Sequence, residues 1–148
     1  MRTSLLLLPL LALLAPGAAQ ACTMVANPHP PTAAQLQAAA RQVVDHAAAI
    51  IDGEVIRPVV PGHRPALVRV HRQFTGPPRA EVEVGILTSC DIPLVRLGER
   101  ARMILTGGPD VWFIRMGMGA AEAAAIDRLL GSDRARDWPY VQGTVVPQ

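Results

Sequence analysis

The stretch "ALVRVHRQFTGPPRAEVEVGI", residues 66–86, carries the clearest fold signal because it contains two segments with the two-residue period of a β-strand. The second segment, "AEVEVGI", puts its valines and isoleucine on one face and its glutamates on the other. Between the segments, "GPP" at residues 76–78 cannot continue a strand. The stretch therefore predicts two strands joined by a turn.

Three further strands are predicted on either side of this pair. "IIDGEVIRP" at residues 50–58 has strand character, and Gly53 inside it indicates a bulge or a close backbone approach. "ARMILTGG" at 101–108 and "VWFIRM" at 111–116 follow, separated by a Gly-Gly-Pro-Asp turn. Five short strands between residues 50 and 115 predict a small barrel or sandwich.

Two helices flank the predicted strands. Thr32 is a suitable N-cap for an Ala-rich segment without Gly or Pro, which predicts a helix over residues 32–48. Its apolar face consists mostly of small residues, so we expect it to lie close against the sheet. "GAAEAAAIDRLL" predicts a second helix over 119–130, and Gly131 follows as a left-handed C-terminal cap.

The last segment, residues 132–148, is expected to be a surface tail that Trp138 and Tyr140 hold in part. The sequence contains no internal repeat. It also contains no long low-complexity linker. Residues 22–148 are therefore expected to form a single domain of the β-dominated α+β class.

The first 21 residues have the three parts of a secretory signal peptide. Arg2 supplies a positive charge, residues 5–15 are almost entirely leucine and alanine, and Ala-Gln-Ala at 19–21 is a cleavage site. No later stretch approaches the ~20 apolar residues that a membrane-spanning helix needs. The sequence predicts a mature chain that begins at Cys22 and is periplasmic or secreted.

The charge balance argues against a nucleic-acid partner. The chain has 14 basic and 12 acidic residues, and one of the basic residues lies in the leader. Arginines are concentrated in "HRPALVRVHRQFTGPPR", residues 63–79, but few aromatic residues are present to stack on bases. We interpret these arginines as the solvated face of a strand.

Motifs for catalysis and for metal or cofactor binding are weak. No two histidines have an H-x-H or H-x-x-x-H spacing, so no intrinsic metal site is expected. No G-x-G-x-x-G or Walker pattern offers a nucleotide site, and no cofactor is expected. The histidines are His29, His46, His63 and His71. Ser89 and Ser132 are not in a G-x-S-x-G context. A Cys90 nucleophile with His71 as its base is the one hydrolytic arrangement that these residues suggest, and it competes with a disulfide at Cys90.

Cys22 has two interpretations. Two cysteines in an exported chain most simply pair with each other, and the loop closed between Cys22 and Cys90 would stabilise the fold by about 4 kcal/mol. A lipidated cysteine would also follow the leader directly. Gln20 fits a lipoprotein signal poorly, but the sequence alone leaves the lipid-anchored alternative open.

The residues resemble a known family. "CTMVANPHPPTA" at 22–33 is similar to the amino-terminal ridge of the tissue inhibitors of metalloproteinases. "AAAIIDGEVIRP" at 47–58 resembles the first barrel strand of these inhibitors and of netrin-like modules. "TSCDIPLVRLGERARMIL" at 88–105 follows the pattern of their bacterial relatives, so the resemblance covers residues 22–105.

This resemblance implies a five-stranded OB-type barrel flanked by helices, with a disulfide that ties Cys22 to Cys90. It implies further that the amino group and carbonyl of Cys22 chelate the catalytic zinc of a target protease while the Thr23 side chain enters its specificity pocket. The chain departs from the family where Met24 replaces a second ridge cysteine. A long Ala-rich helix also separates the ridge from the barrel.

These residues leave two classes of function. The first is an exported, non-catalytic protein-binding module, which the resemblance makes an inhibitor-like protein whose partner is a zinc metalloprotease. The second is a periplasmic enzyme or lipoprotein with a site that no motif reveals. We expect the first, because every catalytic motif suggested by the chain is incomplete.

Overall fold

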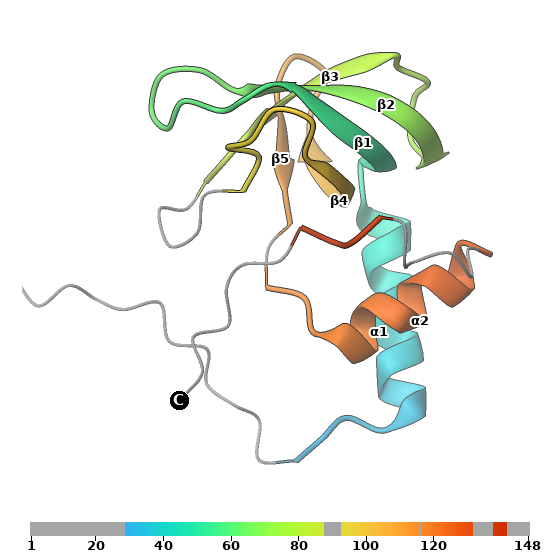
Figure 1. Cartoon of the computed structure of the whole chain (residues 1–148). Coiled ribbons are helices and arrows are strands. Elements are labelled where there is room, and N and C mark those ends of the chain that lie inside the picture. Colours follow the sequence, from blue (N-terminus) through green and yellow to red (C-terminus); the bar gives the residue numbers. More distant parts are fainter. Residues whose placement is uncertain (1–28, 88–92, 116, 132–137, 142–148) are drawn as a thin grey trace, which may run out of the picture.

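The five strands predicted between residues 50 and 115 close into a barrel, and two helices pack on one side of it (Figure 1). The computed structural model describes residues 29–87, 93–115, 117–131 and 138–141. In chain order the elements are α1 (Ala33–His46), β1 (Ala49–Arg57), β2 (Ala66–Thr75), β3 (Glu81–Gly85), β4 (Arg100–Gly107), β5 (Trp112–Ile114) and α2 (Ala120–Leu129). The predicted β-dominated fold with two flanking helices is confirmed.

The strand order around the barrel is β1-β2-β3-β5-β4, with β4 pairing back to β1. β3 and β5 run parallel, and every other pair is antiparallel. Closure of five strands in this order is the arrangement of an OB-type barrel. β5 is shorter than the predicted segment 111–116, because only Trp112–Ile114 enter the sheet.

The barrel interior is filled by alternate side chains of all five strands. Its fully buried members are Val55, Ala66, Val68, Val84, Met103 and Leu105 of the strands and Leu94 of the β3–β4 connection. A second apolar cluster lies outside the barrel, where Ile50 of β1 and Ile104 of β4 face the two helices. The first half of β1 and the middle of β4 are therefore buried on both faces.

Gly53 permits close packing of β1 on β2. The pairing of the two strands shifts between Asp52 and Gly53, as expected for a bulge. A Cβ atom at Gly53 would collide with Cγ1 of Val68, which points into the barrel. Both features predicted for this glycine, the bulge and the close approach, are present.

Helix α1 begins where the sequence predicts. Thr32 accepts a hydrogen bond from the backbone N–H of Gln35, and the Gln35 side chain accepts one from the backbone N–H of Thr32. This capping box satisfies two N–H groups at the helix start. The helix packs chiefly against α2 rather than against the sheet, because α2 is also rich in alanine and the two small surfaces approach closely.

The C-terminal segment differs from the predicted surface tail at its described residues, 138–141. Tyr140 and Val141 are buried, and the backbone of the segment forms a parallel bridge to β4 at Arg102. The prediction that Tyr140 orders this segment agrees with its burial. Within the described parts of the chain, none of the helices combines the length and the apolar character needed to cross a membrane.

The close approach at Gly53 predicts a cost for any side chain there. Gly53→Ala should lower the free energy of unfolding by about 1–3 kcal/mol, because the added methyl group overpacks the barrel against Val68. Urea denaturation monitored by circular dichroism measures this change. Gly119→Ser is the control, since a Cβ at this helix N-cap meets no atom within 4 Å and serine is a favourable capping residue. Equal stability of the two variants would contradict the assigned packing.

Candidate functional site

Outward-facing residues of β1 and β4 form three cross-strand pairs that become more exposed along the barrel. The pairs are Ile50 with Ile104, Asp52 with Arg102, and Glu54 with Arg100. The first pair contacts the helices, the second is a buried ion pair, and the third is an ion pair at the surface. The alternation of a β-strand places all three on the outer face, away from the filled interior.

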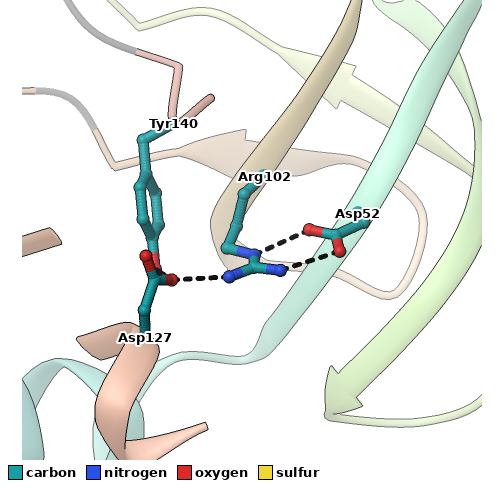
Figure 2. Close-up of polar contacts among 4 residues, drawn as sticks. All are labelled: Asp52, Arg102, Asp127 and Tyr140. Carbon is teal, nitrogen blue, oxygen red and sulfur yellow. Dashed lines mark hydrogen bonds and ion pairs between the residues drawn. The ribbon is translucent and has the colours of Figure 1, made fainter. Parts of the chain in front are cut away.

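Arg102 is the centre of a buried polar network (Figure 2). Its Nε and Nη2 donate to the two carboxylate oxygens of Asp52 at 2.7 and 2.8 Å. Its Nη1 donates to Oδ1 of Asp127 on α2 at 2.5 Å, and Tyr140 Oη donates to the same oxygen at 2.8 Å. The guanidinium also lies 4.5 Å from the centre of the Phe74 ring. The network thus joins the barrel, α2 and the C-terminal segment.

The electrostatics of this network favour the protonated forms of Arg102 and Tyr140. Burial alone would lower the pKa of Arg102, but its hydrogen bonds to Asp52 and Asp127 outweigh burial and raise it. Burial raises the pKa of Tyr140, and its contact with Asp127 raises it further. The guanidinium therefore stays charged and the phenol stays protonated at neutral pH, so this network has the character of a structural clamp.

A second polar cluster lies at the surface around Glu54. Its Oε2 accepts hydrogen bonds from Arg100 and lies 3.1 Å from Nε2 of His71. The Trp138 ring packs on both partners, with its centre 5.3 Å from the His71 ring centre and 5.7 Å from the Arg100 guanidinium carbon. Partial burial opposes ionisation of Glu54, but Arg100 and then His71 outweigh it and hold its pKa below the ordinary 4.5.

A groove opens at the end of the barrel where the β1–β2 loop, the end of β3 and the β4–β5 connection meet. Its volume is about 500 Å³, within the range of ligand pockets. Apolar side chains line most of it, namely Val59, Val60, Ile86, Leu87, Val111 and Phe113. His63 and Arg64 of the β1–β2 loop contribute the basic groups. In OB-type barrels the loops at this position, β1–β2 and β4–β5, commonly bind ligands.

Large apolar side chains are exposed in the two loops around this barrel end. Leu87 is 74 % exposed and Leu97 72 %, and both lie in the connection from β3 to β4 that contains Cys90. Val60 and Val95 are also exposed. Single exposed apolar residues are ordinary, whereas these four are concentrated in two adjoining loops.

Leu94 anchors the connection from β3 to β4 at the cost of a strained backbone. Its side chain is fully buried in the barrel core, its carbonyl accepts from Val59 N–H at 3.0 Å, and its φ is 63°. A left-handed conformation costs a residue other than glycine about 1–2 kcal/mol. Burial of Leu94 holds this conformation, and its neighbour Val95 is left exposed.

The residues predicted for the inhibitor-like site, Cys22, Thr23 and Cys90, lie outside the described residues, as do Ser89 and Ser132. Their disulfide and their roles stay predictions. His71 pairs with Glu54 in the surface cluster, and His63 lies in the groove. Among the residues placed by the structure, no three His, Cys, Asp or Glu side chains are arranged to hold a metal ion.

Comparison of the chain with protein-family models, with curated proteins and with solved structures gave no match. The OB-type assignment therefore depends on strand order and pairing. The groove and the exposed apolar loops lie at the same end of the barrel.

Sequence reasoning missed both the buried network and the groove. A single charge inside an apolar strand was the available signal for the network, since Asp52 follows two isoleucines and Arg102 lies within "ARMIL". For the groove the signal was weaker. Residues 59–65, "VVPGHRP", could be assigned only as a turn-rich connection.

The network predicts that removing the Asp52 carboxylate destabilises the protein much more than removing the nearby Glu54 carboxylate. Asp52→Ala should lower the free energy of unfolding by about 3–5 kcal/mol, because it leaves Arg102 buried without its bidentate partner. Glu54→Ala is the matched control, two residues further along the same face, and should have a much smaller effect because its partner Arg100 is exposed. Urea denaturation of both variants is the measurement. Asp52→Asn provides a milder change if the alanine variant fails to fold, and equal effects at the two positions would contradict the clamp.

The surface cluster predicts that Glu54 contributes to the free energy of unfolding and that this contribution is lost in acid. A carboxylate whose pKa is lowered by folding stabilises the native state above its unfolded pKa, and this stabilisation disappears as the pH falls through the folded pKa. The stability difference between the native protein and Glu54→Gln should therefore be present above pH 4.5 and shrink as the pH falls below it. Unfolding curves from neutral pH to about pH 3 test this, and a difference that does not change with pH would rule it out.

Proposed function

We propose that this chain is an exported, non-catalytic protein-binding module that acts through its N-terminal Cys22–Thr23 ridge and the loops around Cys90. The observation that supports it best is the group of exposed apolar side chains in these loops, headed by Leu87 and Leu97. They lie at one end of a barrel whose interior is already filled with side chains. Exposed apolar surface of this kind is suited to contact with another protein.

The ridge is proposed from the resemblance to metalloproteinase inhibitors. A disulfide from Cys22 to Cys90 would hold the mature N-terminus beside the exposed loops, where its amine and carbonyl could chelate the zinc of a target protease. The chain from Cys22 to Thr32 spans at most about 35 Å. Helix α1 has 14 residues and is about 21 Å long, so this chain length allows the ridge to return past the helix to the barrel.

Export is part of the same proposal. The leader of residues 1–21 directs the chain to the periplasm or the exterior, where a disulfide between two cysteines persists. Thiol alkylation of the mature protein without reductant tests the pairing: no added mass is expected. Lipid mass on Cys22, or two alkylated thiols, would contradict the disulfide-bound ridge.

The inhibitory role is tested by extending the mature chain by one alanine before Cys22. We expect the native mature protein to inhibit at least one enzyme in a panel of exported zinc metalloproteases. The extended form should be weaker by about 100-fold or more, because the added residue displaces the chelating amine. Thermal unfolding of both forms shows that the fold is unchanged. The inhibition constants against each protease are the measurement.

A one-alanine extension after Gln148 is the matched control and should leave inhibition unchanged, because it adds the same residue without altering the amino group of Cys22. Equal inhibition by the two extended forms would show that the N-terminus does not act as the ridge. If no protease of the panel is inhibited, the zinc metalloprotease is removed as a partner.

A further inference from the structure

The groove at the end of the barrel is held in shape by its own backbone. In the β1–β2 loop, Val60 N–H donates to the carbonyl of Arg64 at 2.9 Å, and the Val60 carbonyl accepts from His63 and Arg64 at the same distance. Gly62 turns this loop with a φ of 71°. Val59, at the start of the loop, is buried. A loop closed in this way needs little ordering when a ligand binds, which lowers the entropic cost of association.

Gly85, which lines the groove, allows Phe113 to approach the end of β3 closely. A Cβ atom there would lie 2.9 Å from Cε1 of Phe113, so only glycine allows the half-buried aromatic ring to lie beside the end of β3. Ile86 and Leu87 follow Gly85 and line the same groove, with Leu87 strongly exposed. Ile86, Leu87 and Phe113 therefore present apolar surface to the groove.

The basic side chains of the groove, His63 and Arg64, make no ion pair within the described residues. Arg57 at the nearby end of β1 is paired with Glu83 at 2.6 Å, and Arg69 is near Glu81 at 3.8 Å. By contrast, Arg64 has no ion pair and no side-chain hydrogen bond in the described part of the chain. An exposed guanidinium beside apolar surface is complementary to a carboxylate carried by an apolar segment.

We infer that this groove binds an extended apolar peptide segment of a partner protein that carries an aspartate or glutamate side chain opposite Arg64 and His63. The apolar side chains of the segment pack on Phe113, Ile86 and Leu87, and its carboxylate meets the β1–β2 loop. The inference rests on the proposed binding function but not on the Cys22–Thr23 ridge, since the groove is built from other residues.

A segment carrying a single carboxylate fits the charge distribution better than a polyanion does. The groove contributes one guanidinium and one imidazole, and the chain as a whole is close to neutral. Nucleic acids need several phosphate contacts and aromatic stacking surfaces. Phe113 is half-buried and supplies the only benzene ring among the groove residues.

The test uses the full mature chain and three pools of heptapeptides. In each pool the flanking positions are drawn from apolar residues, and the central residue is aspartate, asparagine or lysine. The aspartate pool should bind about three times more tightly than the asparagine pool and about ten times more tightly than the lysine pool. Amide NMR shifts should change chiefly in residues 59–65 and 85–87.

Two pairs of variants locate the interaction. Arg64→Gln should abolish the preference for aspartate over asparagine, whereas Arg79→Gln should keep it, because Arg79 is an exposed arginine in the β2–β3 turn at the opposite end of the barrel. Leu87→Ser should weaken binding of every pool about fivefold or more, because it removes apolar contact area. Leu129→Ser on α2 removes an exposed leucine elsewhere and should not.

Three results would overturn the inference: equal binding of the three pools, equal behaviour of Arg64→Gln and Arg79→Gln, or NMR shifts confined to other residues. The chain extended by alanine before Cys22 should bind the aspartate pool as the native chain does. Loss of peptide selectivity with intact protease inhibition would reject the groove alone. Intact selectivity with no inhibition of any protease would reject the ridge alone.

Discussion

The bidentate ion pair between Asp52 and Arg102 sets the register in which the barrel closes. It couples β1 to β4 at the closing seam, with both charges on the outer face. A slip of either strand by one residue would turn the charge of that strand into the apolar interior, away from its partner. Through Asp127 and Tyr140, the same guanidinium also determines where α2 and the C-terminal segment dock (Figure 2). Strand pairing, helix packing and the position of the C-terminal segment therefore share one buried cation.

The two ends of the barrel have different physical roles. At one end the helices cover Ile50 and Ile104, so the strands are buried on both faces and the buried arginine has its partners. At the other end the loops leave leucine and valine side chains in water, and Leu94 keeps a strained backbone to anchor them. The buried network and the helix-covered cluster belong to the first end, and the exposed apolar loops to the second. OB-type barrels serve many unrelated functions, so the chemistry of this second end matters more for function than the fold does.

The two proposed contacts of this second end complement each other. A ridge at Cys22 would supply a metal ligand, which acts only on a partner with an open coordination site. The groove below Arg64 would supply apolar area and one charge, which act on a flexible segment of any partner that has the matching carboxylate. A protein that used both contacts would bind its partner more tightly, because the first contact raises the effective concentration for the second. Neither contact requires the buried network to change, since the clamp lies on the covered side of the barrel.

Local patterns in the sequence were sufficient to predict the elements and the class of the fold. Alternation in β2 and β3, the Thr32 cap and the glycines at 53 and 131 act over a few residues, and such signals can be interpreted without tertiary contacts. The ion network and the groove could not be predicted in this way. Asp52 and Arg102 are 50 residues apart, and the groove joins three segments that meet when the barrel closes. Packing of α1 on α2 and the burial of Tyr140 have the same origin, because they depend on which surfaces remain uncovered once the strands have paired.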